Sequence, residues 1–265
     1  MKSSRFSKSR ALIALTVSTI ALSACATDRM TTGSIGSRSK PVEQMTAVEL
    51  RGALPSYRAL YERNRKDKRA AMAYASILRM NSMDDQALAV MRQAAIAHPE
   101  DRDILAAYGK ALAGAGEFTA ALDAVQRAQD PATPDWRLLS AEGAIYDQIG
   151  RPNEARVRYQ KALQMVPGEP SVLSNMAMSH MLQNELPAAE SYLQQAVQHP
   201  AADSRVRQNL ALVVGLQGRF EEAQQIATRE LSPSEAEANM RYLQSMLTQQ
   251  NAWNLIKQED QSKQQ

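Results

Sequence analysis

Residues 136–169, WRLLSAEGAIYDQIGRPNEARVRYQKALQMVPGE, decide the fold of this chain, because their pattern of small residues returns every 34 residues. Gly143, Ala155 and Ala162 occupy the eighth, twentieth and twenty-seventh positions of this block. The first two positions hold Ala or Gly in every block, and the third holds Ala in all blocks except the last, which has Glu230. The five blocks, which follow one another without an insertion, are 68–101, 102–135, 136–169, 170–203 and 204–237.

Small residues at fixed positions allow two helices to approach closely, because a larger side chain would push the helix axes apart. Gly150 lies between two apolar stretches of the quoted block and suits the left-handed residue that ends a helix. Pro152 then suits the first turn of a second helix. Each block is therefore predicted to fold as a helix hairpin.

This pattern resembles the tetratricopeptide repeat (TPR), whose unit is a helix hairpin of 34 residues. The resemblance covers residues 68–237 and implies an all-α fold. We expect a right-handed superhelix, or solenoid, of about five TPR hairpins with helical caps. Glu230 departs from the pattern, so the second helix of the fifth hairpin is expected to pack irregularly.

The flanks of the repeats are predicted to be helical caps. Residues 46–67 contain apolar residues near helical spacing and form the predicted N-terminal cap. Ser232 to Glu235 has the spacing of a capping box, and the C-terminal capping helix is predicted for 238–255. The polar residues 256–265 are predicted to be a disordered tail.

The amino terminus has the features of an export signal. Four basic residues precede an apolar run at Ala11–Leu22, which is too short for a helix that must span a bilayer with roughly 20 residues. Residues Leu22 to Cys25 (LSAC) resemble a bacterial lipobox, which implies that 1–24 is a lipoprotein signal peptide and that Cys25 is lipidated. The alternative is an incidental cysteine beside an ordinary signal peptide.

The lipobox resemblance also implies a location. The lipidated chain would be anchored in the bacterial cell envelope, and the absence of Asp after Cys25 favours the outer membrane, with the protein facing the periplasm. Residues 25–45, rich in Ser, Thr and Gly, are predicted to be a flexible tether.

The overall charge does not indicate nucleic-acid binding. The chain has 31 Lys+Arg against 28 Asp+Glu, but Lys2, Arg5, Lys8 and Arg10 lie in the predicted signal peptide, where no acidic residue occurs. Removing that segment leaves a nearly neutral chain. One cysteine and three histidines in the whole sequence offer no disulfide framework, no metal-ligand spacing and no catalytic constellation. We therefore predict no enzyme, no cofactor and no metal site.

The TPR resemblance places partner recognition on the concave surface formed by the first helix of each hairpin. In the fourth and fifth blocks, two asparagines occupy the sixth position and are predicted to bond the backbone of an extended peptide, next to an adaptable Met and Leu strip. The predicted partner-binding residues are Asn175, Met178, Met181, Leu182, Arg205, Asn209, Leu212 and Leu216. The alternative is that the C-terminal capping helix covers this strip.

A lipidated solenoid with these parts resembles the TadD-type repeat lipoproteins of Tad/Flp pilus assembly. Lipobox and repeats are generic, and only the closing segment 232–247 is more particular. The resemblance implies a scaffold that helps to assemble an envelope machine, with pilus secretin components as partners in the groove and the membrane contacted through the lipid. The alternatives are a periplasmic adaptor for cell-wall enzymes or proteases, and an outer-membrane protein assembly lipoprotein.

Overall fold

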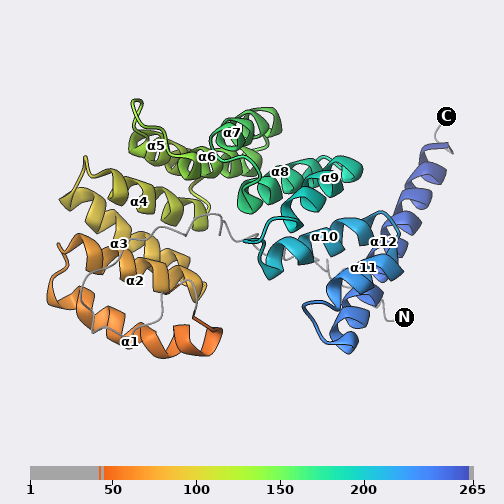
Figure 1. Cartoon of the computed structure of the whole chain (residues 1–265), viewed down its shortest axis with the longest axis horizontal. Coiled ribbons are helices and arrows are strands. Elements are labelled where there is room, and N and C mark those ends of the chain that lie inside the picture. The colour runs from red at the N-terminus through yellow and green to blue at the C-terminus, as the bar shows by residue number, and fades with distance from the viewer. Residues whose placement is uncertain (1–41, 43–44, 263–265) are drawn as a thin grey trace, which may run out of the picture.

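The computed structural model describes residue 42 and residues 45–262, with side chains up to residue 249. Over this part of the chain the regular structure consists of twelve α-helices without a strand, arranged as a curved stack (Figure 1). The predicted signal peptide and nearly all of the predicted tether, including Cys25, lie outside the described residues. Each helix packs mainly against its neighbours in sequence. The prediction of an all-α solenoid is confirmed.

The five blocks of the sequence correspond to five helix pairs between two single helices. The elements are α1 (Ala47–Arg63), α2 (Lys68–Met80), α3 (Asp84–Ala97), α4 (Arg102–Gly114), α5 (Phe118–Ala128), α6 (Trp136–Gln148), α7 (Pro152–Met165), α8 (Pro170–Leu182), α9 (Leu186–Val197), α10 (Ser204–Leu216), α11 (Phe220–Ala227) and α12 (Pro233–Ser262). The first helices of the repeats are thus α2, α4, α6, α8 and α10.

The small residues of the pattern lie where the helices of one pair touch. A Cβ atom on Gly109 would stand 2.5 Å from Cγ2 of Val125, and one on Gly143 would stand 2.5 Å from Cε1 of Tyr159. Both distances are far below an ordinary van der Waals contact. In these two repeats the large side chain on the second helix therefore leaves room only for glycine at the eighth position.

The turn inside each hairpin requires a left-handed residue, which glycine supplies in three repeats. Gly116, Gly150 and Gly218 have φ between 74° and 83°. Ser82 and Asn184 hold the same place in the first and fourth repeats, with φ of 57° and 59°. Asn adopts this region more readily than most residues, whereas Ser has no such advantage, so the geometry of the repeat overrides the local preference there.

The two ends of the stack differ from each other. At the N-terminal end, Thr46 and Glu49 form a capping box at the start of α1. At the other end, α12 starts at Pro233, directly after Ser232, whose hydroxyl accepts from the Glu235 backbone N–H at 3.4 Å. The helix continues through 256–262, which the sequence predicted to be disordered. That stretch contains Lys, Gln and Glu, which are good helix formers, and it extends a helix that is already nucleated.

The fifth repeat has the shortest of these helices. α11 stops at Ala227, and Glu230 follows it as part of a turn. The carboxylate of Glu230 pairs with the guanidinium of Arg207 on α10. A charged residue at a position that is small elsewhere therefore forms an ion pair instead of packing between helices, as its departure from the pattern suggested.

Candidate functional site: the inner face of the repeat stack

The first helices of successive repeats form a continuous row. α2 contacts α4, α4 contacts α6, α6 contacts α8 and α8 contacts α10, whereas the second helices contact mainly first helices. Elements on the inner side of a curved stack lie closer together than those on the outer side. The row of first helices is therefore the concave face, where the sequence placed partner recognition.

The apolar residues predicted on this face are covered to different degrees. Met178 is buried, with 9% of its surface exposed, whereas Leu182 at the end of α8 is 50% exposed. Met181, Leu212 and Leu216 are half-buried and pack against a hydrophobic cluster that includes residues of α8, α9, α10 and α12. Leu182 is thus the apolar residue of the predicted site that solvent reaches most freely.

The capping helix covers the end of the stack and only part of the apolar strip. α12 packs against α10 and α11, and it continues the row of first helices beyond α10. Leu243 and Met240 of α12 lie against Gly215, where an added Cβ would meet Leu243 Cδ2 at 2.6 Å. α12 therefore occupies the place of the first helix of a further repeat, and Leu182 on α8 remains exposed.

The two asparagines have partners within the chain. The Asn175 amide donates to the Ser140 hydroxyl oxygen at 3.0 Å, and the Asn209 amide donates to the Ser174 hydroxyl oxygen, also at 3.0 Å. Each bond joins the first helices of consecutive repeats. Because an amide group has two N–H donors and a carbonyl acceptor, each side chain keeps hydrogen-bonding capacity for a ligand. The serines were not predicted from the sequence. Each occupies the fifth position of its repeat, and the asparagine that it binds occupies the sixth position of the next repeat.

Arg205, the charged residue of the predicted site, is exposed and pairs with Asp203 at 2.9 Å. Asp203 also caps α10, because its side chain accepts from the Val206 backbone N–H. This arrangement holds the guanidinium near the N-terminal end of α10.

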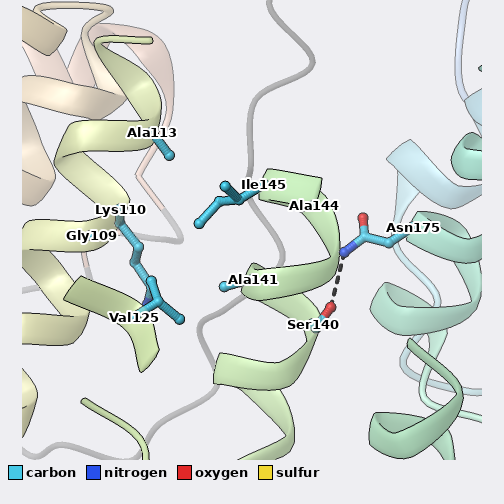
Figure 2. Close-up of a pocket in the computed structure, with 9 residues that line it drawn as sticks. All are labelled: Gly109, Lys110, Ala113, Val125, Ser140, Ala141, Ala144, Ile145 and Asn175. Atoms are coloured by element: carbon cyan, nitrogen blue, oxygen red, sulfur yellow. Dashed lines mark hydrogen bonds between the residues drawn. The ribbon is translucent and has the colours of Figure 1, made fainter. Parts of the chain in front are cut away.

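A small cavity of about 20 Å³ opens on the concave face between α4 and α6. Figure 2 shows Lys110 of α4 on one side, Ala141 and Ala144 of α6 on the other, and the Asn175–Ser140 hydrogen bond beyond them. This volume is close to that of one water molecule. The Lys110 amine has no hydrogen bond or ion pair within the part of the chain that the structure describes, so its charge is available on the concave face.

A polar cluster lies where α6, α7 and α8 meet. The carboxylate of Asp147 accepts hydrogen bonds from Ser179 Oγ at 2.7 Å and from the Tyr159 hydroxyl at 2.9 Å. Burial raises the pKa of Asp147, and these two hydrogen bonds oppose that rise. Ser179 is fully buried, and Tyr159 is 1% exposed. The Asp147 side chain is therefore bound to the interior of the stack.

The comparisons agree with the repeat pattern. Two family models, both described as "Tetratricopeptide repeat", match residues 85–135 and 149–213. These two segments of the chain are similar to tetratricopeptide repeats, and the described helices have the arrangement of a TPR solenoid. A search of curated proteins finds no match.

Solved structures share the TPR fold at low sequence identity. PilW, described as a widely conserved type IV pilus biogenesis factor, is 20% identical with a TM-score of 0.58, covering 77% of this chain and 94% of that chain. PilF of Pseudomonas aeruginosa is 20% identical with a TM-score of 0.50, covering 68% of this chain and 82% of that chain. Cut9–Hcn1, from the APC/C, is 13% identical with a TM-score of 0.57, covering 76% of this chain and 42% of that chain.

The TPR fold is a scaffold for protein–protein interaction, and neither family match indicates a catalytic family. Within residues 42 and 45–262, no group of His, Cys, Asp and Glu has an arrangement that could hold a metal ion. In the same part of the chain, each helix is too short or too polar to traverse a lipid bilayer.

Proposed function

We propose that this TPR protein is a lipid-anchored scaffold of the bacterial cell envelope that assists the assembly of a multiprotein machine. Cys25 carries the lipid, and the repeat stack faces the periplasm from the outer membrane. The partner is a peptide or protein segment bound on the concave face. The machine is a Tad/Flp-type pilus, and the partners are components of its secretin.

The observation that carries this proposal is the exposed end of the apolar strip on α8. Leu182 is 50% exposed beside half-buried Met181, although α12 caps the stack. An apolar side chain in contact with water gains about 25 cal/mol for each Å² that a partner covers. Asn175 and Asn209 lie along the same row of helices and can orient a bound backbone.

Two further observations support the envelope and pilus parts of the proposal. The sequence Leu22 to Cys25 matches a lipobox and follows a basic and apolar leader. PilW, a type IV pilus biogenesis factor, and PilF of Pseudomonas aeruginosa share the TPR fold with this chain. At 20% identity this likeness concerns the fold, so the choice of machine needs its own experiment.

The experiment is crosslinking from the concave face in cells. A photoreactive amino acid at Leu182 is expected to capture a pilus secretin component. The matched control places the same group at Val157, which is 48% exposed on α7, the second helix of its repeat. Capture that occurs at 182 and not at 157 supports the proposal.

The identity of the captured protein decides between the candidate functions. A murein hydrolase or protease in place of pilus proteins would favour an adaptor for cell-wall enzymes. An outer-membrane β-barrel assembly component would favour an assembly lipoprotein. Equal capture at both sites would argue against recognition on the concave face.

A further inference from the structure

The lining of the concave face can be identified position by position. In each repeat, the second, fifth, sixth, ninth, twelfth and thirteenth positions fall within about 120° of one another around the first helix, so their side chains share one side of it. The observed contacts place that side on the concave face. Serines at the fifth position bond asparagines at the sixth, and the cavity beside Lys110 is lined mainly by residues at these positions.

Basic residues outnumber acidic residues at these positions. The five basic residues are Arg69, Arg79, Lys110, Arg137 and Arg205, and the two acidic residues are Asp103 and Asp147. Both acidic residues are already bound within the chain. Asp103 accepts a hydrogen bond from Lys68 Nζ at 2.6 Å, and Asp147 accepts from Ser179 and Tyr159. The concave face therefore presents positive charge, mostly on the first three repeats.

Two of the cations, Arg69 on α2 and Lys110 on α4, have no hydrogen bond or ion pair in the part of the chain that the structure describes. Arg69 is exposed, and Lys110 is half-buried beside a cavity that Asn175 also lines (Figure 2). A partly desolvated ammonium without a counter-charge attracts a carboxylate more strongly than a fully hydrated one does. The second N–H of the Asn175 amide gives a ligand a further donor there.

The C-terminal half of the face has a different chemistry. α8 contains no Lys, Arg, Asp or Glu, and Leu182 at its end is 50% exposed beside half-buried Met181. A segment that lies along the row of first helices therefore meets positive charge over α2 and α4 and apolar surface over α8.

We propose that the concave face binds a bipartite protein segment, with Asp or Glu side chains at Lys110 and Arg69 and an apolar side chain at Leu182. The inference rests on the proposed use of this face for partner binding and adds the chemistry of the partner. Charge complementarity selects acidic residues, because these two cations have no counter-charge within the described residues. A single-stranded nucleic acid fits less well, because its bases stack on aromatic side chains and the lining positions contain no Phe, Tyr or Trp.

The spacing of the helices sets the length of the segment. Packed helices stand about 8–10 Å apart, so α4 and α8, which have α6 between them in the row, are roughly 20 Å apart. An extended chain advances about 3.3 Å per residue. The acidic and apolar residues of the partner should therefore be about six residues apart.

Fluorescence polarisation with designed peptides tests the proposal on the full chain with Cys25→Ser, which removes the proposed lipid. The probe is a labelled peptide with two glutamates, a spacer of five serine and glycine residues, and two leucines. Comparison peptides carry glutamine or lysine in place of glutamate, or serine in place of leucine. Lys110→Glu is expected to weaken binding of the acidic peptide about tenfold at low salt, because a repulsion replaces an attraction. The matched control is Lys161→Glu, an exposed position on α7, which should change the affinity less than about twofold.

Two further comparisons separate direct contact from a disturbed fold. The lysine peptide should bind Lys110→Glu more tightly than it binds the parent chain, which a general loss of structure would not produce. Leu182→Ser should weaken binding of the acidic peptide and leave binding of the serine peptide unchanged.

Equal affinity of the parent chain for the glutamate and glutamine peptides would overturn the proposal. If Leu182→Ser still weakened binding of both peptides, recognition on the concave face would stand without the acidic preference. An RNA of 12 nucleotides that binds more tightly than the acidic peptide would also overturn the proposal, as would an acidic peptide without measurable binding at 1 mM. Failure of the proposed function itself would instead give equal crosslinking at 182 and 157 in cells.

Discussion

Gly143 lies where the two helices of the third repeat come closest. A Cβ there would meet Tyr159, whose ring is buried and whose hydroxyl is bonded to Asp147. The ring cannot swing away without losing that hydrogen bond. The packing of Tyr159 therefore requires glycine at position 143.

Gly143→Ala is expected to destabilise the fold by about 1–3 kcal/mol, because one methyl group overpacks a filled interface. The matched control is Gly52→Ala in α1, where an added Cβ meets nothing within 4 Å. That change should stabilise the protein by about 0.5–1 kcal/mol, because alanine favours the helix. Urea denaturation of both variants measures the difference, and equal effects would contradict the packing argument.

Asp147 gives the protein a pH dependence that can be isolated. Burial raises the pKa of Asp147 in the folded state, so the native protein holds this proton more tightly than the unfolded chain does. The contribution of Asp147 to stability is therefore present at acid pH and is lost as the pH rises through the raised pKa. Asp147→Asn removes this titration.

The measurement is the difference in unfolding free energy between the parent and Asp147→Asn from pH 3 to pH 7. The parent should lose stability relative to the variant as the pH increases. Glu185 is a useful comparison because its hydrogen bond from His180 holds the pKa of its carboxyl below the ordinary value. The parent measured against Glu185→Gln should show the opposite trend.

At the scale of the elements, hydrogen bonds link the first helices of repeats three, four and five. Asn175 binds Ser140, and Asn209 binds Ser174. The corresponding residues between repeats two and three are Ala106 and Ala141, which cannot form such a bond. Polar coupling at this position is therefore confined to the C-terminal half of the stack.

A double-mutant cycle measures this coupling. Asn209→Ala and Ser174→Ala should each cost about 1 kcal/mol, with an interaction energy of about 0.5–1.5 kcal/mol between them. Helical content should stay the same, and partner binding is expected to weaken with Asn209→Ala. Asn209→Ala paired with Ser140→Ala is the control cycle, because these two side chains do not bond each other. Strict additivity in the first cycle would show that the hydrogen bond contributes nothing.

At the scale of the whole molecule, the repeat stack and the amino terminus have separate roles. The stack presents the concave face and α12, while the proposed attachment to the membrane depends on Cys25 alone. Neither family match extends to the leader. Attachment can therefore be altered without changing the fold.

Cys25→Ser is expected to abolish lipidation and to shift the protein from the detergent-extracted membrane fraction to the soluble fraction. Cell fractionation followed by mass spectrometry of the amino terminus checks both results. Ser23→Ala, which leaves the cysteine in place, is the control. A Cys25→Ser protein that still needs detergent would argue against the lipobox interpretation.

The sequence by itself determined the repeat and therefore the fold. Small residues recur where helices must touch, and that requirement is local to each hairpin and leaves a period of 34 residues. The resemblance of this repeat to the TPR then implied that the first helices form the concave face, and helical spacing indicated which of their side chains share a face.

The tertiary structure alone decided how each residue of that face is used. The sequence does not distinguish an asparagine that is free to bind a partner from one that is already hydrogen-bonded. In the structure, Asn175 and Asn209 each bond a serine of the preceding repeat. The side chain of Leu182 is exposed, that of Met178 is buried, and the carboxylate of Asp147 is hydrogen-bonded to buried Ser179. The extent and placement of α12 likewise came only from the structure. Periodicity states which face a residue occupies, whereas exposure depends on contacts with residues far away in the chain.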